Sequence, residues 1–302
     1  MKWQYKVADY VIEIESSNAV QDSVLDNIQG FGVFSLKKSE DIKAILRYFT
    51  YADEKLIESA KIFMEDNASL YSIDFEGINC DFYRDGDRFL FRMHPPKGEI
   101  HYFVALPENG AFHVISNYEL NPQPILLRFS LWMATAISIS YAGGILIHSS
   151  TLIYNTKAYL FLGESGTGKS THTRLCRENV KGAGLLNDDS PLIRVVDGEV
   201  YACGSPWSGK TPCYKDEKYP LGGIVRLSQA PYNKIARLSV LKAFAALYPS
   251  CPPAFAQDKE LSDNICSTLS AIIAKVPVFS MECLPDKDAV LMVKNAFEEN
   301  YK

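Results

Sequence analysis

A glycine-rich segment constrains this chain more than any other feature. Residues 163–170 read Gly-Glu-Ser-Gly-Thr-Gly-Lys-Ser and satisfy the pattern G-x-x-x-x-G-K-[S/T]. The apolar run Tyr159–Leu162 precedes the segment and is typical of a short buried strand, and a helix is predicted over Gly168–Asn179. A strand, a glycine-rich loop and a helix in this order form a phosphate-binding loop, so the sequence predicts an α/β fold around it.

The residue types of this loop indicate its chemistry. Glycines allow consecutive backbone N–H groups to converge on phosphate oxygens, and the start of the following helix adds partial positive charge. We expect Lys169 to neutralise the β- and γ-phosphates of ATP and the Ser170 hydroxyl to ligate Mg²⁺. The alternative, a glycine-rich turn with a solvated lysine, is disfavoured by the flanking strand and helix. The residues predicted to bind the nucleotide are Gly163, Glu164, Ser165, Gly166, Thr167, Gly168, Lys169, Ser170 and Thr171.

Two adjacent carboxylates follow the next predicted strand, in the segment Leu185–Asp189. Neighbouring side chains on a strand point to opposite faces, so we expect one carboxylate to face Mg²⁺ and the other to face an attacking hydroxyl. Asp188 is the predicted metal ligand beside Ser170, and either Asp188 or Asp189 is the base. Taken alone, the pair would more simply open a surface turn at Ser190, and the phosphate loop is what favours the catalytic interpretation.

Three other side chains are weaker candidates. His148 ends a predicted strand before the loop, and a single histidine is more often structural than catalytic. The segment Gly204–Lys210 could bring Trp207 and Lys210 over the nucleotide or acceptor, since long Pro/Gly loops are often functional, or it could be a packing loop. Arg226, on the next predicted strand, could stabilise transition-state charge, although structurally paired arginines are commoner. Lys210 and Arg226 are therefore candidate substrate contacts.

Composition narrows the class of protein. The 302 residues carry 31 Lys+Arg against 36 Asp+Glu, a net charge of −5, so no overall basic field is available for a nucleic acid. The 7 cysteines show no CxxC and no Cys/His pairing at metal-ligand spacing, which favours reduced thiols in a cytoplasmic protein. No basic segment leads into an apolar one at the N-terminus, so a secretory signal is not expected. The uncharged stretch Phe129–Ile147 contains serines and is cut by Gly143-Gly144, which predicts a buried core helix and no membrane span.

Two regions of different pattern follow one another, and Asn121–Pro124 marks the boundary because its prolines break regular elements. Residues 1–120 predict a β-rich domain of unknown role, and residues 121–302 predict an α/β unit. In the first region we expect strands at Tyr5–Glu15, Phe31–Leu36, Leu70–Phe75, Cys80–Tyr83, Arg88–Met93, His101–Leu106 and Ala111–Ser116, and helices near Asp41–Tyr48 and Glu54–Phe63. In the second we expect helices at Ile125–Tyr141, Gly168–Asn179, Leu238–Tyr248, Leu261–Lys275 and Ala289–Glu299, and strands at Ile145–His148, Ser150–Tyr154, Ala158–Leu162, Ile224–Leu227 and Val278–Cys283.

These motifs together resemble a known family. His148, the loop Gly163–Thr171 and the Asn-Asp-Asp at 187–189 are similar to the catalytic domain of HPr serine kinase/phosphorylase, over residues 140–230. The Ser-Gly-Thr-Gly-Lys core also looks like that of ATP-dependent phosphoenolpyruvate carboxykinase. The resemblance implies a P-loop domain of HPr kinase/PEP carboxykinase type with a β-rich N-terminal domain. It also implies ATP and Mg²⁺ as cofactors, Asp188 or Asp189 handling the proton of an accepting serine, His148 near the transferred phosphate, and a homo-oligomer, since HPr kinases assemble as hexamers.

Two departures from the family leave the phosphoryl acceptor open. The glycine-rich segment that HPr kinases carry after the paired aspartates is not recognisable here, and the N-terminal region does not resemble theirs. The sequence therefore predicts a divergent, Mg·ATP-dependent kinase that moves the γ-phosphoryl group to a hydroxyl, preferentially a serine of a protein or peptide. Two alternatives remain open: a small-molecule kinase or carboxykinase-like phosphotransferase, and a nucleotide-sensing module without transfer. No nucleic-acid or membrane partner is expected.

Overall fold

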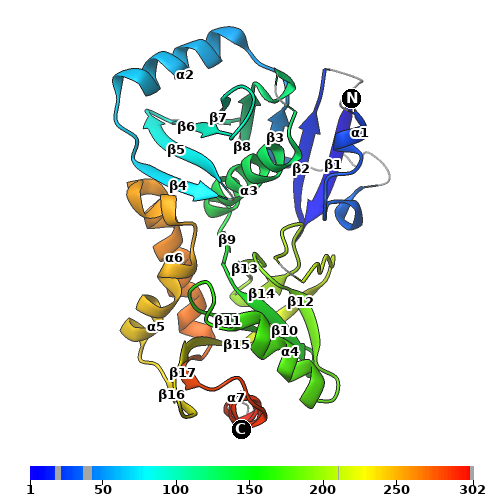
Figure 1. Ribbon diagram of the computed structural model, residues 1–302, viewed down its shortest axis with the longest axis vertical. Coiled ribbons are helices and arrows are strands. Elements are labelled where there is room, and N and C mark those ends of the chain that lie inside the picture. Colours follow the sequence, from blue (N-terminus) through cyan, green and yellow to red (C-terminus); the bar gives the residue numbers. More distant parts are fainter. Residues whose placement is uncertain (18–21, 37–42, 76, 121, 210, 300–302) are drawn as a thin grey trace. The chain divides into compact units, whose positions relative to one another are not determined.

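The computed structural model describes all residues except 18–21, 37–42, 76, 121, 210 and 300–302, and it is a mixed α/β structure (Figure 1). The chain forms two compact units. Unit 1 is Met1–Ala142 with Ala254–Ser262, and unit 2 is Gly143–Pro253 with Asp263–Lys302. The sequence places a boundary at residue 121, whereas the structure divides the chain one helix later. Helix α3 (Pro124–Tyr141) belongs to unit 1 because it packs on strands of that unit.

Within the described residues, unit 1 is built on an eight-stranded sheet with the strand order β1-β2-β3-β8-β7-β6-β5-β4. The pairs β2/β3 and β3/β8 are parallel, and the others are antiparallel. The strands are β1 (Lys2–Val7), β2 (Tyr10–Glu15), β3 (Ala44–Phe49), β4 (Tyr71–Phe75), β5 (Ile78–Asp85), β6 (Arg88–His94), β7 (His101–Glu108) and β8 (Ala111–Ser116).

Helices pack on the sheet of unit 1. Successive side chains of a strand point to opposite faces, so each helix contacts alternate residues. Leu90 and Val104 pack with the apolar face of α2 (Glu54–Asp66). Their neighbours point to the opposite face, where the ring of Phe89 lies 6.5 Å from that of Tyr141 at the end of α3. The core of unit 1 is therefore formed on both faces of its sheet.

Helix α3 confirms the expectation of a buried core helix. Among the described residues it is long and apolar enough to cross a membrane by length and composition, and 72% of its residues are buried. Its buried serines hydrogen-bond within the helix, as when Ser138 Oγ donates to the Ala134 carbonyl at 2.8 Å. Ser130 Oγ also lies 2.7 Å from the buried Tyr48 hydroxyl of β3. These contacts fix α3 on the sheet of unit 1.

Three expectations for the first region are wrong. Tyr5–Glu15 is not one strand, because Ala8 and Asp9 take positive φ and turn the chain between β1 and β2. Phe31–Leu36 contains the 3₁₀ turn η2 (Gly32–Phe34). The helix expected near Asp41–Tyr48 is strand β3, with residues 41 and 42 outside the described part. Helix α1 (Asp22–Leu25) was not anticipated.

Unit 2 contains a second sheet, nine-stranded in the part that the structure describes, with the path β12-β10-β11-β15-β14-β13-β9 and with β17 joining β15 to β16. Strand β15 belongs to two groups: Lys218–Pro220 pair with β14, and the remainder pairs in parallel with β11 and β17. The strands are β9 (Gly144–Leu146), β10 (Ser150–Tyr154), β11 (Lys157–Leu162), β12 (Gly184–Asn187), β13 (Leu192–Val196), β14 (Glu199–Cys203), β15 (Lys218–Gln229), β16 (Lys234–Arg237) and β17 (Val278–Cys283).

The direction of these strands brings distant segments to one edge. Strands β11, β15 and β17 are parallel, so their carboxyl ends lie at the same edge of the sheet. Strand β10 runs antiparallel to β11 and to β12, so β10 starts at this edge and β12 ends there. Ligands of open α/β sheets bind beyond the carboxyl ends of the strands. Gly163–Thr171 follow β11, Asp188 and Asp189 follow β12, and His148 precedes β10, all at this edge, whereas Arg226 lies within β15.

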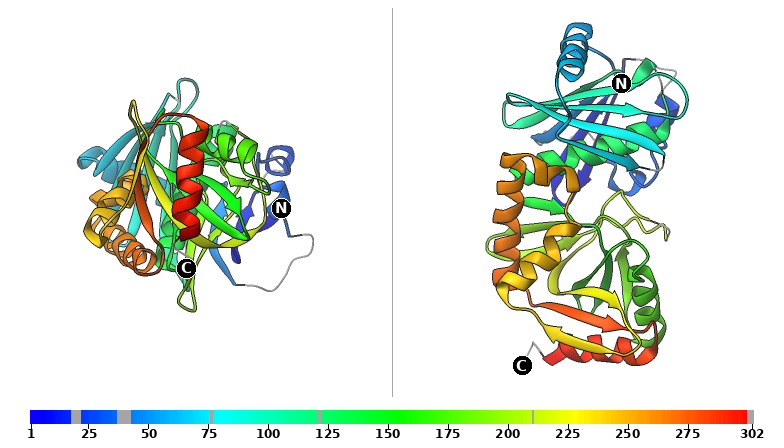
Figure 2. Two further views of the ribbon diagram at one scale, coloured as in Figure 1. Left: turned by 90° about the horizontal axis from the view of Figure 1, so that it is seen from below. Right: turned by 60° about the vertical axis from the view of Figure 1, so that its left-hand side comes forward.

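The helices of unit 2 confirm the sequence expectation. They are α4 (Lys169–Asn179), α5 (Val240–Leu247), most of α6 (Lys259–Lys275) and α7 (Lys287–Glu299). Helices α4 and α7 lie side by side (Figure 2), and together with the sheet they enclose an apolar core. In it, the ring of Tyr159 on β11 stacks on that of Phe297 at 4.1 Å. This packing anchors the strand and the helix on either side of the glycine-rich loop.

Candidate functional site

The glycine-rich loop connects β11 to α4, as the sequence predicts. Its glycines occupy conformations that side chains would not allow. Gly163 has φ +150°, and a Cβ there would lie 2.4 Å from Thr167 Oγ1 and 3.2 Å from the Leu227 carbonyl oxygen. Gly168, with φ +101°, immediately precedes the first residue of α4. The loop therefore turns tightly and leads into the helix with its backbone exposed on one side.

Lys169 lies across this loop. Its Nζ donates hydrogen bonds to the carbonyl oxygens of Gly163 at 2.9 Å and of Glu164 at 3.2 Å. Burial lowers the pKa of Lys169, and although the charges of Asp189 and Asp188 raise it in part, the net shift is downward. The lysine is thus held beside the two carboxylates, and an added anion at the loop would favour its charged form.

Asp188 is a buried carboxylate with a fixed orientation. Its Oδ1 accepts a hydrogen bond from Ser150 Oγ at 2.7 Å, and its Oδ2 accepts one from the Thr211 backbone N–H at 3.3 Å. Ser150 Oγ also lies 2.8 Å from Thr173 Oγ1, in the first turns of α4. Asp188 is therefore tied to β10 and, through two hydroxyls, to the helix that starts at Lys169.

Asp189 points the other way and is accessible. Its Oδ1 lies 3.3 Å from His148 Nδ1, with side-chain exposures of 35% and 48%, and its Oδ2 accepts a hydrogen bond from Ser190 Oγ at 2.7 Å. Burial alone would raise the pKa of Asp189, but the hydrogen bonds from His148 and Ser190 and the charges of His148 and Lys169 outweigh burial and lower it. The carboxylate is therefore ionised at neutral pH.

The backbone keeps His148 in place. The His148 N–H donates to the Ser250 carbonyl at 2.8 Å, and the next residue, Ser149, donates to the Asp189 carbonyl at 2.8 Å. The structure thus brings together Lys169, Asp188, Asp189 and His148 at the predicted edge of the sheet.

Asn187, the first residue of the Asn-Asp-Asp segment, has no role predicted from the sequence and is the centre of a buried network. Its Oδ1 accepts hydrogen bonds from the N–H groups of Asp189 and Ser190, both at 2.9 Å. Its Nδ2 donates to Ser205 Oγ at 3.2 Å and to the Trp207 carbonyl at 3.0 Å. An amide has both the donors and the acceptor that this position requires. Asn187 therefore joins the aspartate pair to the loop that follows β14.

Replacing Asn187 with alanine is expected to lower the free energy of unfolding by about 3 kcal/mol, because several buried groups lose their partners together. Urea unfolding followed by fluorescence measures the change. The control is Asn179→Ala, where the lost hydrogen bond from Nδ2 to the Leu175 carbonyl is exposed at the end of α4. Equal stability changes in the two variants would contradict the central position of Asn187.

The loop after β14 is a packed structure. Trp207 is only 4% exposed, and a Cβ on Gly209 would lie 2.8 Å from the Asp188 carbonyl oxygen. A Cβ on Gly204 would lie 1.9 Å from the Lys215 carbonyl oxygen, so the two ends of the loop approach as closely as a glycine permits. Lys210 lies outside the described residues. The loop therefore covers the backbone of the aspartate pair, and the position of Trp207 agrees with a packing role.

Arg226, near the end of β15, donates a hydrogen bond from Nη1 to the Ala246 carbonyl at 3.0 Å. Its charge contributes to lowering the pKa of Lys169. Lys169, Asp188, Asp189, His148 and Arg226 form a charged cluster. One guanidinium nitrogen of Arg226 is already hydrogen-bonded to α5.

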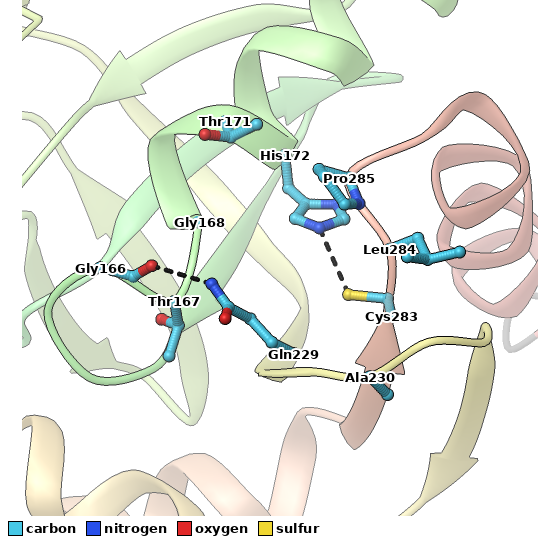
Figure 3. Close-up of a pocket in the computed structure, with 10 residues that line it drawn as sticks. All are labelled: Gly166, Thr167, Gly168, Thr171, His172, Gln229, Ala230, Cys283, Leu284 and Pro285. Carbon is cyan, nitrogen blue, oxygen red and sulfur yellow. Dashed lines mark hydrogen bonds between the residues drawn. The ribbon is translucent and has the colours of Figure 1, made fainter.

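A cavity of about 570 Å³ opens on the other side of the glycine-rich loop (Figure 3). Strands β15 and β17 end at its walls. Its lining residues are Gly166, Thr167, Gly168, Thr171, His172, Gln229, Ala230, Cys283, Leu284 and Pro285. Gly166–Thr171 belong to the predicted nucleotide-binding segment, whereas the residues after β15 and β17 were not anticipated, because they are distant in the sequence and form no motif.

The donor set of the charged cluster suits Mg²⁺. Among the described residues no three His, Cys, Asp or Glu side chains are grouped so that they could hold a metal. Magnesium bound together with a nucleotide needs only one or two carboxylates, because phosphate oxygens and waters complete its coordination. Asp188, and the exposed Ser170 in the first turn of α4, offer hard oxygen ligands of this kind.

Comparisons with known proteins give likenesses among solved structures and none in sequence. No protein-family model matches the chain, and no curated protein matches it in sequence. Among solved structures, the chain is similar to the HPr(Ser) kinase/phosphatase from Coxiella burnetii. The match covers 52% of this chain and 95% of that one, with 12% sequence identity and a TM-score of 0.31. At this identity and TM-score the likeness says nothing of the function, and only the residues of the site indicate one.

Proposed function

We propose that unit 2 is a Mg·ATP-dependent phosphotransferase that moves the γ-phosphoryl group to a hydroxyl. The observation that carries this proposal is the position of Lys169, which lies on the glycine-rich loop beside Asp188, Asp189 and His148. Phosphoryl transfer needs positioning and charge stabilisation more than covalent chemistry from the protein. A lysine and two carboxylates at a phosphate loop supply both.

The nucleotide phosphates lie on the backbone N–H groups of Gly163–Thr171, and Lys169 exchanges its contacts with loop carbonyls for contacts with the β- and γ-phosphates. Asp188 and Ser170 would hold Mg²⁺, which when bound would offset the negative charge of the phosphates. Ser150 and Thr211 fix the Asp188 carboxylate for this task.

Asp189 and His148 handle the acceptor. The Asp189 carboxylate is ionised and accessible, so it orients the acceptor hydroxyl and receives its proton while the hydroxyl oxygen bonds to the γ-phosphorus. The bond from the γ-phosphorus to the bridging oxygen breaks, and ADP leaves. His148 is hydrogen-bonded to Asp189 and is the proposed contact of the transferred group.

The resemblance of the motifs to HPr serine kinases supports a serine as the acceptor. The acceptor is then a serine of a protein or peptide. Because the glycine-rich segment of HPr kinases is not recognisable after Asp189, the acceptor protein need not be HPr. The loop after β14 adjoins the aspartate pair, since a Cβ on Gly209 would lie 2.8 Å from the Asp188 carbonyl oxygen.

Transfer of label from ATP tests the proposal. The purified protein is incubated with Mg²⁺ and γ-labelled ATP in cell extract, beside the Lys169→Ala variant. A labelled protein band that depends on Lys169 supports the serine kinase, and label found only in small molecules favours a small-molecule acceptor. ATP that binds but stays intact under all conditions would contradict transfer and leave a nucleotide-sensing module.

A further inference from the structure

We infer that the cavity lined by the ends of β15 and β17 binds the base and ribose of the nucleotide, so that the triphosphate runs across the loop toward Asp189. This inference rests on the proposed function, and it assigns the orientation of the nucleotide and the side chains that recognise its nucleoside half. The volume of about 570 Å³ lies within the range of about 300–1,000 Å³ found for small-molecule sites.

The charged side chains of the site and the cavity lie on different sides of the loop, apart from Arg226, which lies on β15 and donates to the Ala246 carbonyl. On the β10 and β12 side lie Asp188, Asp189 and His148, with Lys169 beside the two carboxylates. The cavity on the β15 and β17 side is lined without an Asp, Glu, Lys or Arg side chain among the described residues. The loop leaves β11, which lies between these strands in the sheet order. A nucleotide has one highly charged end and one uncharged aromatic end, and the loop offers a matching surface on each side.

The cavity contains one imidazole and one thiol, those of His172 and Cys283, and both residues are buried. Burial, followed by the charge of Asp286, raises the pKa of Cys283 to about 11. His172 Nε2 lies 3.3 Å from Cys283 Sγ (Figure 3), which holds the imidazole against the wall. Beyond the glycine-rich loop itself, the walls offer no lysine or arginine, so they suit a base and a ribose better than a phosphate group.

One side chain connects the cavity to the phosphate loop. Gln229 Nε2, at the end of β15, donates a hydrogen bond to the Gly166 carbonyl at 3.2 Å (Figure 3). The Gln229 amide is exposed and has further hydrogen-bonding capacity for a ribose hydroxyl or a base edge. Gln229 can therefore contact the nucleoside while it holds the loop that binds the phosphates.

Photolabelling tests the assignment directly. The purified full chain is irradiated with Mg²⁺ and 8-azido-ATP, and labelled peptides are mapped by mass spectrometry, with excess ATP as the competitor. We expect label on the segments Gln229–Ala230 and Cys283–Pro285, suppressed by ATP. Label that ATP suppresses but that maps only elsewhere, for example to the loop after β14, would overturn the assignment and leave the proposed function intact.

A blocked cavity provides the second test. Ala230 lines the cavity, and its N–H donates to the Cys283 carbonyl at 3.2 Å, a contact that does not depend on the side chain. Ala230→Trp is expected to weaken Mg·ATP binding at least about tenfold and to leave binding of inorganic tripolyphosphate unchanged. Ala236→Trp, at an exposed position on β16 outside the cavity, is the matched control and should bind both probes normally.

The outcomes separate the two proposals. The nucleoside assignment would be overturned if Ala230→Trp bound ATP as tightly as the wild-type protein, or if it lost affinity equally for ATP and tripolyphosphate. Nucleotide binding by the wild-type protein would still stand. Failure of the unchanged protein to bind either probe would overturn the phosphotransferase and the nucleoside site together. Because photolabelling uses the unchanged protein, the assignment can be tested even where Ala230→Trp does not fold.

Discussion

Replacing Lys169 with alanine is expected to lower phosphoryl transfer by at least about 10³-fold, since the charge that develops on the γ-phosphoryl group loses its protein counter-charge. ATP affinity should fall about 10- to 100-fold, because a charge-assisted hydrogen bond contributes about 1.5–3 kcal/mol. The contacts of Lys169 with the Gly163 and Glu164 carbonyls also disappear. Single-turnover transfer and calorimetric ATP binding measure the two effects separately.

The control for this variant is Lys181→Ala, since Lys181 is exposed in the turn after α4. It should bind ATP and transfer phosphate like the unchanged protein, and both variants should show the same circular dichroism spectrum. Wild-type transfer rates in Lys169→Ala would refute the role of the loop, whatever else binds there.

The second large effect is expected for Asp189→Asn. The amide has nearly the same shape as the carboxylate but cannot receive the acceptor proton, so transfer should fall by about 10²–10⁴-fold. Mg·ATP affinity should change by less than about threefold, because Asp188 and not Asp189 is the proposed metal ligand. Asp188→Asn should instead weaken Mg·ATP binding, as it removes the charge of a buried carboxylate held by Ser150 and Thr211.

The contrast between the two aspartates is the informative measurement. Asp197→Asn, at an exposed turn between β13 and β14, controls for the loss of one negative charge and should change neither rate nor affinity. If Asp189→Asn loses ATP affinity as strongly as Asp188→Asn does, the division between metal ligand and base is wrong. Both roles would then belong to the pair as a unit.

Much of the charged side of the site could be predicted because its signals are local. The residues of the glycine-rich loop are consecutive, and Asp188 and Asp189 follow a strand whose end had to lie near that loop. The sequence could not predict the cavity in the same way. Gln229 and Cys283 meet the loop only because β15 and β17 run parallel to β11, and neither residue belongs to a pattern that reveals its partner.

The same distinction explains the errors in unit 1. In β3, Ala44, Leu46 and Tyr48 are buried in alternation, which is the period of a strand. The sequence does not show this alternation, because Ile45 and Phe49 are apolar as well, and β3 pairs in parallel with β2 and β8, both distant in the sequence. Helix α3 was predicted correctly because a long uncharged run cut by glycines is itself a local signal.

The network around Asn187 implies that the position of the loop after β14 and the position of the aspartate carboxylates are thermodynamically linked. One amide group holds the backbone of Asp189 and the carbonyl of Trp207, so a displacement of the loop after β14 changes the position of the carboxylates. Any molecule whose affinity depends on the position of that loop would therefore alter the affinity for Mg·ATP, and Mg·ATP would alter the affinity for that molecule by the same factor. Cooperative binding of nucleotide and acceptor would then need no contact between them.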